Sequence, residues 1–268
     1  MSESFELFQV DSFTDRAFAG NPAAVCLCPS PREPEWMHLV AREMNLSETA
    51  FVVPREGDGH DLRWFTPAIE VELCGHATLA TAHVLWECGR LLPEEVARFH
   101  TRSGLLTAER RGAWIEMDFP ARRLEPVLEP PPAFAAAFGC EPLFVGRYRA
   151  DYLVEVASEA AVRAATPDVE LIRRVPARAA ILTARASTAP FDFVSRYFAP
   201  GSGIAEDPVT GAAHCALAPF WGERLGKHEM LAYQASARGG SMRVRLDGDR
   251  VKLLGQAVTV LRGRLVNV

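Results

Sequence analysis

Apolar and polar residues change their spacing several times along the chain, and each change marks an expected element. Short runs that alternate or stay apolar, such as residues 5–10 and 23–28, predict β-strands. Residues 35–44 place apolar side chains at helical spacing, with charges on the opposite face. Residues 77–87 and 213–224 read as helices, and a glycine follows each of them. The pattern therefore predicts a chain of many short strands and a few helices.

Strand signals continue to the C-terminus, where residues 230–234, 241–246, 250–253 and 257–262 predict antiparallel strands. Between the two halves, residues 120–132 are rich in proline and carry few other structural signals. Such a composition is typical of an interdomain linker. We therefore expect an N-terminal domain over 1–120 and a C-terminal domain over 130–256, joined by a linker at 121–129.

One stretch of the chain occurs twice. Residues 62–85 read LRWFTPAIEVELCGHATLATAHVL, and residues 195–219 read SRYFAPGSGIAEDPVTGAAHCALAP. In both copies an aromatic strand is followed by an acidic loop, and a glycine then opens a run of small residues. Two copies are too few for a solenoid and indicate two similar domains that face each other across a cleft.

The helix starts at Gly75 and Gly211 are candidate anion sites. A helix N-terminus presents unpaired N–H groups and the positive end of the helix dipole. Small residues there let a ligand approach the backbone, so a carboxylate is a suitable occupant. Ordinary strand-to-helix connections use the same residues, and that alternative stays open for each copy taken alone.

Composition narrows the possible functions. The chain has 268 residues, of which 49% are hydrophobic, so it can build a substantial core. A net charge of -5 and a pI near 5.9 argue against binding to nucleic acid. No apolar run reaches transmembrane length, and the acidic N-terminus does not resemble a signal peptide. Six cysteines without framework spacing favour a reduced, cytoplasmic protein.

Several polar residues are candidates for chemistry, each with a structural alternative. Glu48 precedes an apolar strand, where desolvation would raise its pKa toward that of a general acid or base; it could equally be a solvated strand-edge residue. His76 lies in the first helical turn, where the helix dipole favours a neutral ring; it could contact a ligand or simply pack. Asp207 precedes the second helix start and could simply cap it. Asn21 is a ligand contact or a turn residue.

Other chemistries lack their motifs in this sequence. There is no GxxxxGK phosphate loop and no GxSxG elbow, and Gly201-Ser202-Gly203 lacks the third glycine of a dinucleotide fingerprint. The histidines show no metal-ligand spacing with cysteines or acids. We therefore expect chemistry without a metal or a cofactor.

The motifs FTDRAFAGNPAAV, MNLSETAFV, RWFTP, ELCGHATLA and EDPVTGAAH, in this order, resemble those of the PhzF-like family of phenazine biosynthesis. That family is similar in fold to diaminopimelate epimerase and proline racemase. The resemblance implies an α+β fold of two similar domains related by a pseudo-twofold axis. Each would be a curved, mostly antiparallel sheet around a central helix, opening at Gly75 or Gly211. The C-terminal strand, 257–268, would complete the first domain.

The resemblance also implies an activity. The family is known for a cofactor-free isomerisation of a cyclic amino acid, so we expect an isomerase that moves a proton on a small carboxylate-bearing substrate between the domains. The catalytic residues would be Glu48, His76 and Asp207. The substrate-binding residues would be Asn21, Ser47, Gly75, Thr210, Gly211 and Ala212. We expect a cytoplasmic homodimer that acts in a biosynthetic process. We expect it to bind neither nucleic acid nor a membrane.

The sequence departs from the related families at the two helix starts. The racemases use one cysteine before each helix, whereas this chain has Cys74 before the first and Thr210 before the second. The PhzF-like motif usually continues EDPVTGS, but Ala212 replaces that serine and leaves only backbone N–H groups. Two alternatives remain: a racemase or epimerase that uses Glu48 as one base, and a non-catalytic small-acid binding protein of the same fold.

Overall fold

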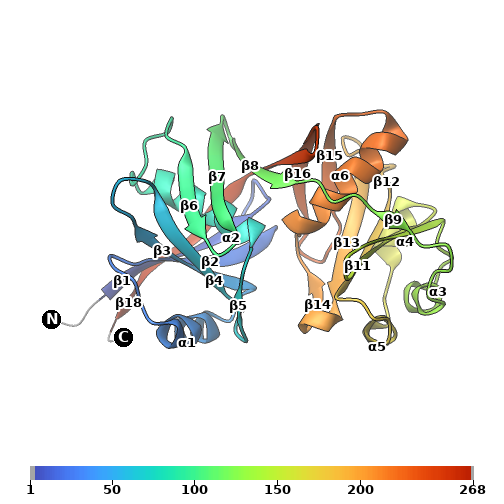
Figure 1. Ribbon diagram of the computed structural model, residues 1–268, viewed down its shortest axis with the longest axis horizontal. Helices are drawn as coiled ribbons and strands as arrows, with labels where there is room; N and C mark the ends of the chain where they lie inside the picture. The colour runs from blue at the N-terminus through green and yellow to red at the C-terminus, as the bar shows by residue number, and fades with distance from the viewer. Residues whose placement is uncertain (1–3, 267–268) are drawn as a thin grey trace. The chain divides into compact units, whose positions relative to one another are not determined.

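The computed structural model describes residues 4–266, and the chain divides into two compact units. Unit 1 comprises Met1–Asp118 together with Leu254–Val268, and unit 2 comprises Phe119–Leu253. Both units combine several short strands with a few helices (Figure 1), which confirms the expected α+β fold class. Among the described residues, no helix combines the length and the apolar character that a membrane crossing requires.

The sheet of unit 1 mixes antiparallel and parallel pairs. Its strands are β1 (Ser4–Ser12), β2 (Asn21–Leu27), β3 (Glu48–Pro54), β4 (His60–Phe65), β5 (Glu70–Val71), β6 (Ala97–Thr101), β7 (Gly104–Arg111), β8 (Trp114–Pro120) and β18 (Ala257–Val266). The β2–β3 and β4–β6 pairs are parallel, and the other assigned pairs are antiparallel. Strand β18 lies beside β1 (Figure 1); positions 267–268 of this expected strand lie outside the described residues.

Two helices cover unit 1. Helix α1 (Pro34–Met44) is amphipathic, and its apolar face packs on the Phe5 and Phe51 side of the sheet. Helix α2 (Gly75–Glu87) is buried on all sides, as expected for a helix with apolar residues around its whole circumference. It contacts β1, β2 and β3 and is therefore the central helix of this unit.

Unit 2 contains β9 (Glu125–Pro126), β10 (Phe144–Tyr148), β11 (Asp151–Glu155), β12 (Ala179–Arg185), β13 (Phe193–Ala199), β14 (Ile204–Asp207), β15 (Glu229–Gln234), β16 (Gly240–Asp247) and β17 (Arg250–Gly255). Its helices are α3 (Ala133–Phe138), α4 (Glu159–Ala164), α5 (Val169–Arg173), the single 3-10 turn η1 (Pro200–Ser202) and α6 (Gly211–Leu225). Strand β9, which pairs with β10, lies within the segment that the sequence suggests as a linker.

The two units repeat one pairing order. In unit 1, β1 is antiparallel to β2, β2 is parallel to β3, and β3 is antiparallel to β4. In unit 2, β10, β11, β12 and β13 follow the same sequence of directions. A short hairpin and the central helix come next, α2 in one unit and α6 in the other. The strand after each helix pairs in parallel with the first strand of the preceding hairpin, β6 with β4 and β15 with β13. The sequence repeat is therefore part of a larger structural repeat.

A partly buried ion pair is repeated as well. The Arg63 guanidinium donates two hydrogen bonds to the Glu70 carboxylate, at 2.7 and 2.8 Å. The Arg196 guanidinium donates two to the Glu206 carboxylate, at 2.7 and 2.9 Å. Each pair joins the aromatic strand to the hairpin strand that leads toward the central helix. Such bidentate contacts combine charge with fixed geometry, so both hairpins are held in the same way.

A serine contact holds the loop before each central helix. The Ser103 hydroxyl donates to the Glu72 carbonyl at 2.7 Å, and the Ser236 hydroxyl donates to the Pro208 carbonyl at 2.7 Å. Glu72 and Pro208 each lie two residues after the paired glutamate of their unit. The two helix starts therefore share a supporting framework.

Candidate active site

Glu48 is the first residue of β3, directly after Ser47. Parallel pairing with β2 places Glu48 opposite Ala23, at the end of the sheet where β2 also begins. Successive side chains of a strand point to opposite faces. Phe51 packs on the α1 face, so Glu48 projects from the face that α2 covers. Its side chain is 13% exposed, which leaves a carboxylate that is mostly buried but still reachable.

The start of α2 is fixed by contacts to its own turn and to β1. Cys74 precedes the helix in an extended conformation, and Gly75 is its first residue. The Thr78 hydroxyl donates to the Cys74 carbonyl at 2.6 Å. The Ser12 hydroxyl, at the end of β1, donates to the His76 carbonyl at 2.8 Å. These bonds set the positions from which the Cys74 and His76 side chains project.

Glu48, Cys74 and His76 converge. The His76 Nε2 atom lies 3.3 Å from the Glu48 Oε2 atom, within ion-pair distance although the atoms are not aligned as a hydrogen bond. On the other side of the ring, His76 Nδ1 lies 3.4 Å from the Cys74 sulfur. Burial lowers the pKa of His76 to about 3 and outweighs the hydrogen bond to the Pro22 carbonyl, which raises it. The ring is therefore neutral at physiological pH, and burial is the main cause of this neutrality.

Two of the expected substrate contacts lie beside this cluster. Asn21 begins β2, is fully buried, and is paired with Ser12, whose hydroxyl holds the His76 carbonyl. Ser47 is half-buried and precedes Glu48. Glu48, His76, Asn21 and Ser47 thus occupy one region of unit 1, although 55 positions separate the first and last of them in the sequence.

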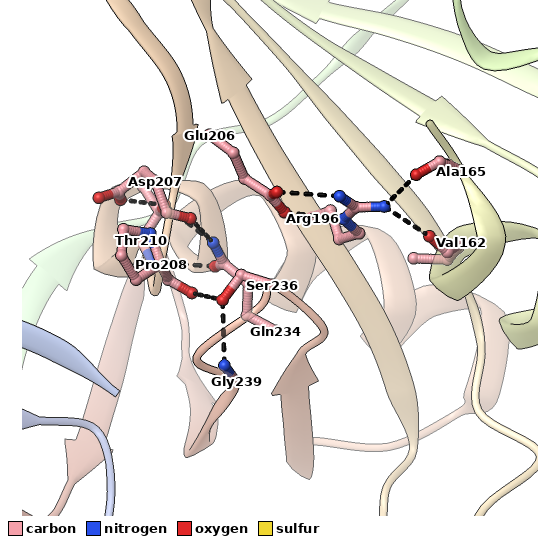
Figure 2. A network of polar contacts seen from close by, with 10 residues as sticks. All are labelled: Val162, Ala165, Arg196, Glu206, Asp207, Pro208, Thr210, Gln234, Ser236 and Gly239. Carbon is pink, nitrogen blue, oxygen red and sulfur yellow. Dashed lines mark hydrogen bonds and ion pairs between the residues drawn. The ribbon is translucent and has the colours of Figure 1, made fainter. Parts of the chain in front are cut away.

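In unit 2, Asp207 and Thr210 are joined by the Gln234 side chain, as Figure 2 shows. The Thr210 hydroxyl donates to the Asp207 carboxylate, and the Thr210 N–H donates to the Gln234 carboxamide oxygen at 2.9 Å. The Gln234 amide group donates to the Asp207 carbonyl at 2.8 Å. Asp207 is not the cap of α6, because Thr210 occupies that position. The Asp207 carboxylate is instead held at the end of β14.

The loop after β15 completes this network (Figure 2). The Ser236 hydroxyl donates to the Pro208 carbonyl and accepts a hydrogen bond from the Gly239 N–H at 3.1 Å. Gly239 has a φ of +64°, and a Cβ atom there would lie 2.1 Å from the Tyr233 hydroxyl oxygen. Glycine is therefore required at this position. Hydrogen bonds therefore connect the loop before α6 with the loop after β15.

Gly211 and Ala212 form the first turn of α6 and carry the backbone N–H groups expected to bind an anion. Gly211 is buried, and Ala212 is partly buried. The His214 Nδ1–H group donates to the Thr210 carbonyl at 2.8 Å, in the place of the Thr78 contact in unit 1. Burial lowers the pKa of His214 to about 4, so this ring is neutral too.

Sequence reasoning missed a cluster beside Asp207. Tyr197 is paired in register with Asp207 across β13 and β14, so the two side chains share a face. Burial raises the pKa of Tyr197, and the negative charge of Asp151 raises it further. The Arg178 Nε group donates to the Asp151 carboxylate at 2.8 Å. Tyr197 falls within the repeated motif and could have been noticed, whereas Arg178 and Asp151 carry no local signal.

The strand registers show which residues correspond. Thr49 is paired with Phe65 in unit 1, and Ala180 is paired with Phe198 in unit 2. Phe65 and Phe198 are equivalent positions of the sequence repeat. Thr49 therefore corresponds to Ala180. Glu48 directly precedes Thr49, and Ala179 directly precedes Ala180, so Glu48 corresponds to Ala179. The second unit therefore has no carboxylate at this position.

The same counting applies to the other site residues. Cys74 corresponds to Thr210 and His76 to Ala212, because each pair stands at the same place in its helix start. Asp207 corresponds to Val71, because Asp207 is paired with Tyr197 and Val71 with Trp64, and each of these aromatic residues follows the arginine of the repeat. The two helix starts therefore share a backbone but carry different functional groups.

A cavity of about 370 Å³ in unit 1 lies away from this cluster. Its lining includes Arg32, Arg63 and Arg102 together with Phe51 and Met37. Phe51 projects from the sheet face opposite to that of Glu48, so the cavity lies on the α1 face and not at the α2 start.

Comparison with known proteins identifies relatives over nearly the whole chain. An uncharacterized isomerase of Halalkalibacterium halodurans is 52% identical over 260 residues, covering 97% of this chain and 98% of the relative. A PhzF-family phenazine biosynthesis protein of Enterococcus faecalis superposes with a TM-score of 0.94 at 38% identity, covering 98% of this chain and 99% of the other.

A more distant structure supports the fold alone. A hydroxyproline epimerase of Agrobacterium vitis superposes with a TM-score of 0.64 at 11% identity, covering 98% of this chain and 93% of that protein. The relation to racemase and epimerase folds, expected from the sequence, is therefore confirmed. Residues 10–263 match the family described as phenazine biosynthesis-like protein. The chain belongs to this PhzC-PhzF family.

Proposed function

We propose that this protein is a cofactor-independent isomerase that moves a proton on a small carboxylate-bearing substrate. The observation that carries the proposal is the contact between the Glu48 carboxylate and the neutral His76 ring at the start of α2. A mostly buried carboxylate beside a neutral imidazole is a suitable general acid–base pair. Membership of a family whose relatives include proteins named isomerases agrees with this class of reaction.

Glu48 is the proposed base. It takes a proton from one substrate carbon and returns it to another, so no group outside the site is needed for the transfer. When the Cys74 thiol donates toward His76 Nδ1, the ring carries its own proton on Nε2, which faces Glu48. In this tautomer His76 orients the Glu48 carboxylate. A fixed orientation of the base is one of the ways in which an enzyme lowers the barrier for proton transfer.

Backbone N–H groups are the proposed carboxylate anchors. The first turns of α2 and α6, at Gly75 and at Gly211 and Ala212, present donors that no side chain of these residues covers. Asn21 and Ser47 add polar contacts beside Glu48. The Thr210 hydroxyl already donates to the Asp207 carboxylate, so Thr210 would contact the substrate with its backbone.

Asp207 is the proposed second polar group of the reaction, where it positions the substrate or relays a proton. Its carboxylate is held by the Thr210 hydroxyl, and its carbonyl is held by Gln234. The proposal requires that one substrate engage both helix starts. A double-mutant cycle of Glu48→Gln and Asp207→Asn tests this requirement, because residues that act on one substrate give non-additive losses.

A racemase or epimerase is the second candidate, and the Cys74 sulfur beside His76 is the observation that favours it. A thiol can act as a base on an α-carbon when a neighbouring group accepts its proton. In that case Cys74→Ala would lose roughly 10³-fold or more in turnover, as expected for an essential catalytic group. Under the isomerase proposal, Cys74→Ala keeps most of the activity.

The test combines binding with exchange. Small carboxylic and cyclic amino acids are screened by thermal shift, and those that stabilise the protein are incubated with it in deuterated water. Wild type should bind and incorporate deuterium at a carbon next to the carboxylate-conjugated system. Glu48→Gln should still bind, because the amide keeps the size and polarity, but should not exchange. Binding without exchange in the wild type would instead indicate a non-catalytic small-acid binding protein.

A further inference from the structure

Three side chains with different metal-binding atoms meet at the start of α2. We propose that Glu48, Cys74 and His76 bind one Zn²⁺ ion reversibly and that the bound ion blocks the site. The blocking effect rests on the proposed function, since it assumes that Glu48 is the base. The binding itself does not depend on that function and can be measured separately.

The donor set and its spacing suit zinc. One carboxylate oxygen, one sulfur and one ring nitrogen lie within 4.8 Å of one another, and among residues 4–266 no other such group of three is found. Zinc binds these atom types at about 2.0–2.3 Å, so its tetrahedral ligands lie roughly 3.5 Å apart. The His76–Glu48 and His76–Cys74 distances of 3.3 and 3.4 Å are already in this range. These two distances involve different ring nitrogens, Nε2 and Nδ1, and only one of them can coordinate. A side-chain rotation must therefore shorten the remaining separation, which is at most 4.8 Å, to about 3.5 Å.

The protonation states and charges of the three ligands also favour the binding of Zn²⁺. Histidine binds a metal through the lone pair of one nitrogen of its neutral ring. Coordination removes the proton of the Cys74 thiol and releases it to water. The thiolate and the Glu48 carboxylate then balance the two positive charges of the ion. Because Cys74 and His76 are 7% and 6% exposed, a locally neutral site avoids the cost of an unpaired buried charge.

The surrounding structure holds the ligands in place. The carbonyls of Cys74 and His76 accept hydrogen bonds from the Thr78 and Ser12 hydroxyls, which fixes the backbone of the helix start. Three protein ligands leave a fourth position of a tetrahedral ion open. An ion bound in this way takes one oxygen of the Glu48 carboxylate and draws negative charge from the other, so the carboxylate becomes a weaker base.

Unit 2 provides an internal reference. The positions that correspond to Glu48, Cys74 and His76 are Ala179, Thr210 and Ala212, which offer no comparable donor set. The proposal therefore requires one high-affinity site per chain and not two, although the backbone of the helix start is repeated.

Cobalt provides a visible probe of the site. Co²⁺ is titrated into the metal-free full chain under reducing conditions, and the thiolate-to-cobalt charge-transfer band is recorded. Wild type should show this band with an endpoint of one equivalent, and Zn²⁺ should displace it. Cys74→Ser should abolish the band. Glu48→Gln and His76→Asn should each weaken Zn²⁺ binding by more than about 100-fold, since loss of even outer-shell partners costs 10–100-fold.

Cys88→Ser is the matched control, because Cys88 follows the same helix at its other end, roughly 20 Å away. It should keep the band and the stoichiometry. Thermal melts without metal establish that each variant is folded. A band that persists in Cys74→Ser, a wild type without a band, or an endpoint of two equivalents would overturn the proposed site.

The blocking effect is measured by deuterium exchange. Saturating Zn²⁺ should stop exchange by the wild type, and a chelator should restore it. Continued exchange at saturating Zn²⁺ would overturn the blocking role while leaving the site. If the wild type exchanges no substrate at all, the proposed isomerase function fails, and the cobalt spectra still decide whether the metal site exists.

Discussion

Units 1 and 2 have the same strand order around their central helices, yet they differ in nearly every polar side chain at the helix start. The repeated features are supports: the Arg63–Glu70 and Arg196–Glu206 pairs and the two serine contacts to the loops. The features that are not repeated are the groups capable of proton chemistry. A helix start can therefore keep its geometry while its chemistry changes, because the ion pair and the serine contact hold the loop while other side chains carry the chemistry.

This difference has a consequence for mechanism. Unit 1 carries Glu48, Cys74 and His76, and unit 2 carries Asp207 with Thr210. Symmetric two-base racemisation needs equivalent bases from the two halves of the fold. Ala179 stands at the position that corresponds to Glu48, so the proposed function uses a single base that both removes and returns the proton.

The largest expected effect comes from placing the carboxylate of unit 1 in unit 2. Ala179 is fully buried and is paired with Asp151, so Ala179→Glu would bury a charge beside another carboxylate. We expect a loss of roughly 3–5 kcal/mol in the free energy of unfolding, as for an uncompensated buried charge. Glu48→Ala, at the corresponding position, should change stability by less than about 1 kcal/mol. Urea unfolding measures both, and tolerance of Ala179→Glu would mean that the two strand starts are equivalent environments.

The next largest effect separates the two ion pairs. Arg196 is 12% exposed and also donates to the Ala165 carbonyl at 2.5 Å, whereas Arg63 is 27% exposed. Arg196→Ala should cost about 3 kcal/mol and Arg63→Ala about 1–2 kcal/mol, since charged hydrogen bonds contribute more when they are buried. Arg55→Ala, which removes an exposed pair with Asp61, should cost at most about 1 kcal/mol. Equal losses at all three positions would remove the structural role assigned to the repeated pairs.

A smaller effect appears in the pH dependence of stability. His76 and His214 have folded pKa values of about 3 and about 4, below the ordinary value of 6.5, because burial disfavours the charged ring. The unfolded chain therefore binds more protons below pH 6.5, and stability falls as the pH is lowered through that window. Each ring contributes a slope of up to about 1.4 kcal/mol per pH unit.

Replacing one ring should flatten this slope. His76→Asn should remove the contribution of one proton between pH 6.5 and pH 3, and His214→Asn should do so down to pH 4. The exposed His228 supplies a matched control variant, His228→Asn. Urea unfolding at a series of pH values gives the slope, and an unchanged slope in His76→Asn would mean that its ring is charged in the folded protein.

The sequence predicts the helix starts because the evidence for them is local. The repeated RWFTP and RYFAP segments and the glycines that follow lie within one continuous stretch in each half. The neutrality of His76 was also predicted from its place in the first turn, although burial turns out to be its main cause. Glu48 was selected through its apolar neighbours and the family motif.

The contacts between distant segments could not be predicted in this way. The spacing of the repeated ion pair is seven residues in unit 1 and ten in unit 2, so the longer second loop hides the correspondence. The Arg178–Asp151 contact joins residues 27 positions apart, and no periodicity brings them together. The meeting of Glu48 with Cys74 depends on the β2–β3 pairing and on the packing of α2, which only the folded chain defines.

The smallest effect is expected at Ala212. Ala212→Ser adds the hydroxyl that the PhzF-like motif usually carries, at a partly buried position in the first turn of α6. Stability should change by less than about 0.5 kcal/mol, as for most substitutions away from the core. Substrate preference in the exchange assay is the informative measurement. A gain in turnover with a different carboxylate would show that this position of unit 2 sets specificity, whereas an unchanged profile would limit its role to the backbone.

The location of the base is tested most directly by the initial rate of deuterium incorporation in Glu48→Gln, Cys74→Ala and Asp207→Asn under identical conditions. We expect Glu48→Gln to lose about 10²–10⁴-fold, the range of general acid–base catalysis. Cys74→Ala should retain most of the wild-type rate, and Asp207→Asn should lie between them. Undiminished exchange in Glu48→Gln, with the loss transferred to Cys74→Ala or Asp207→Asn, would contradict a single base in unit 1.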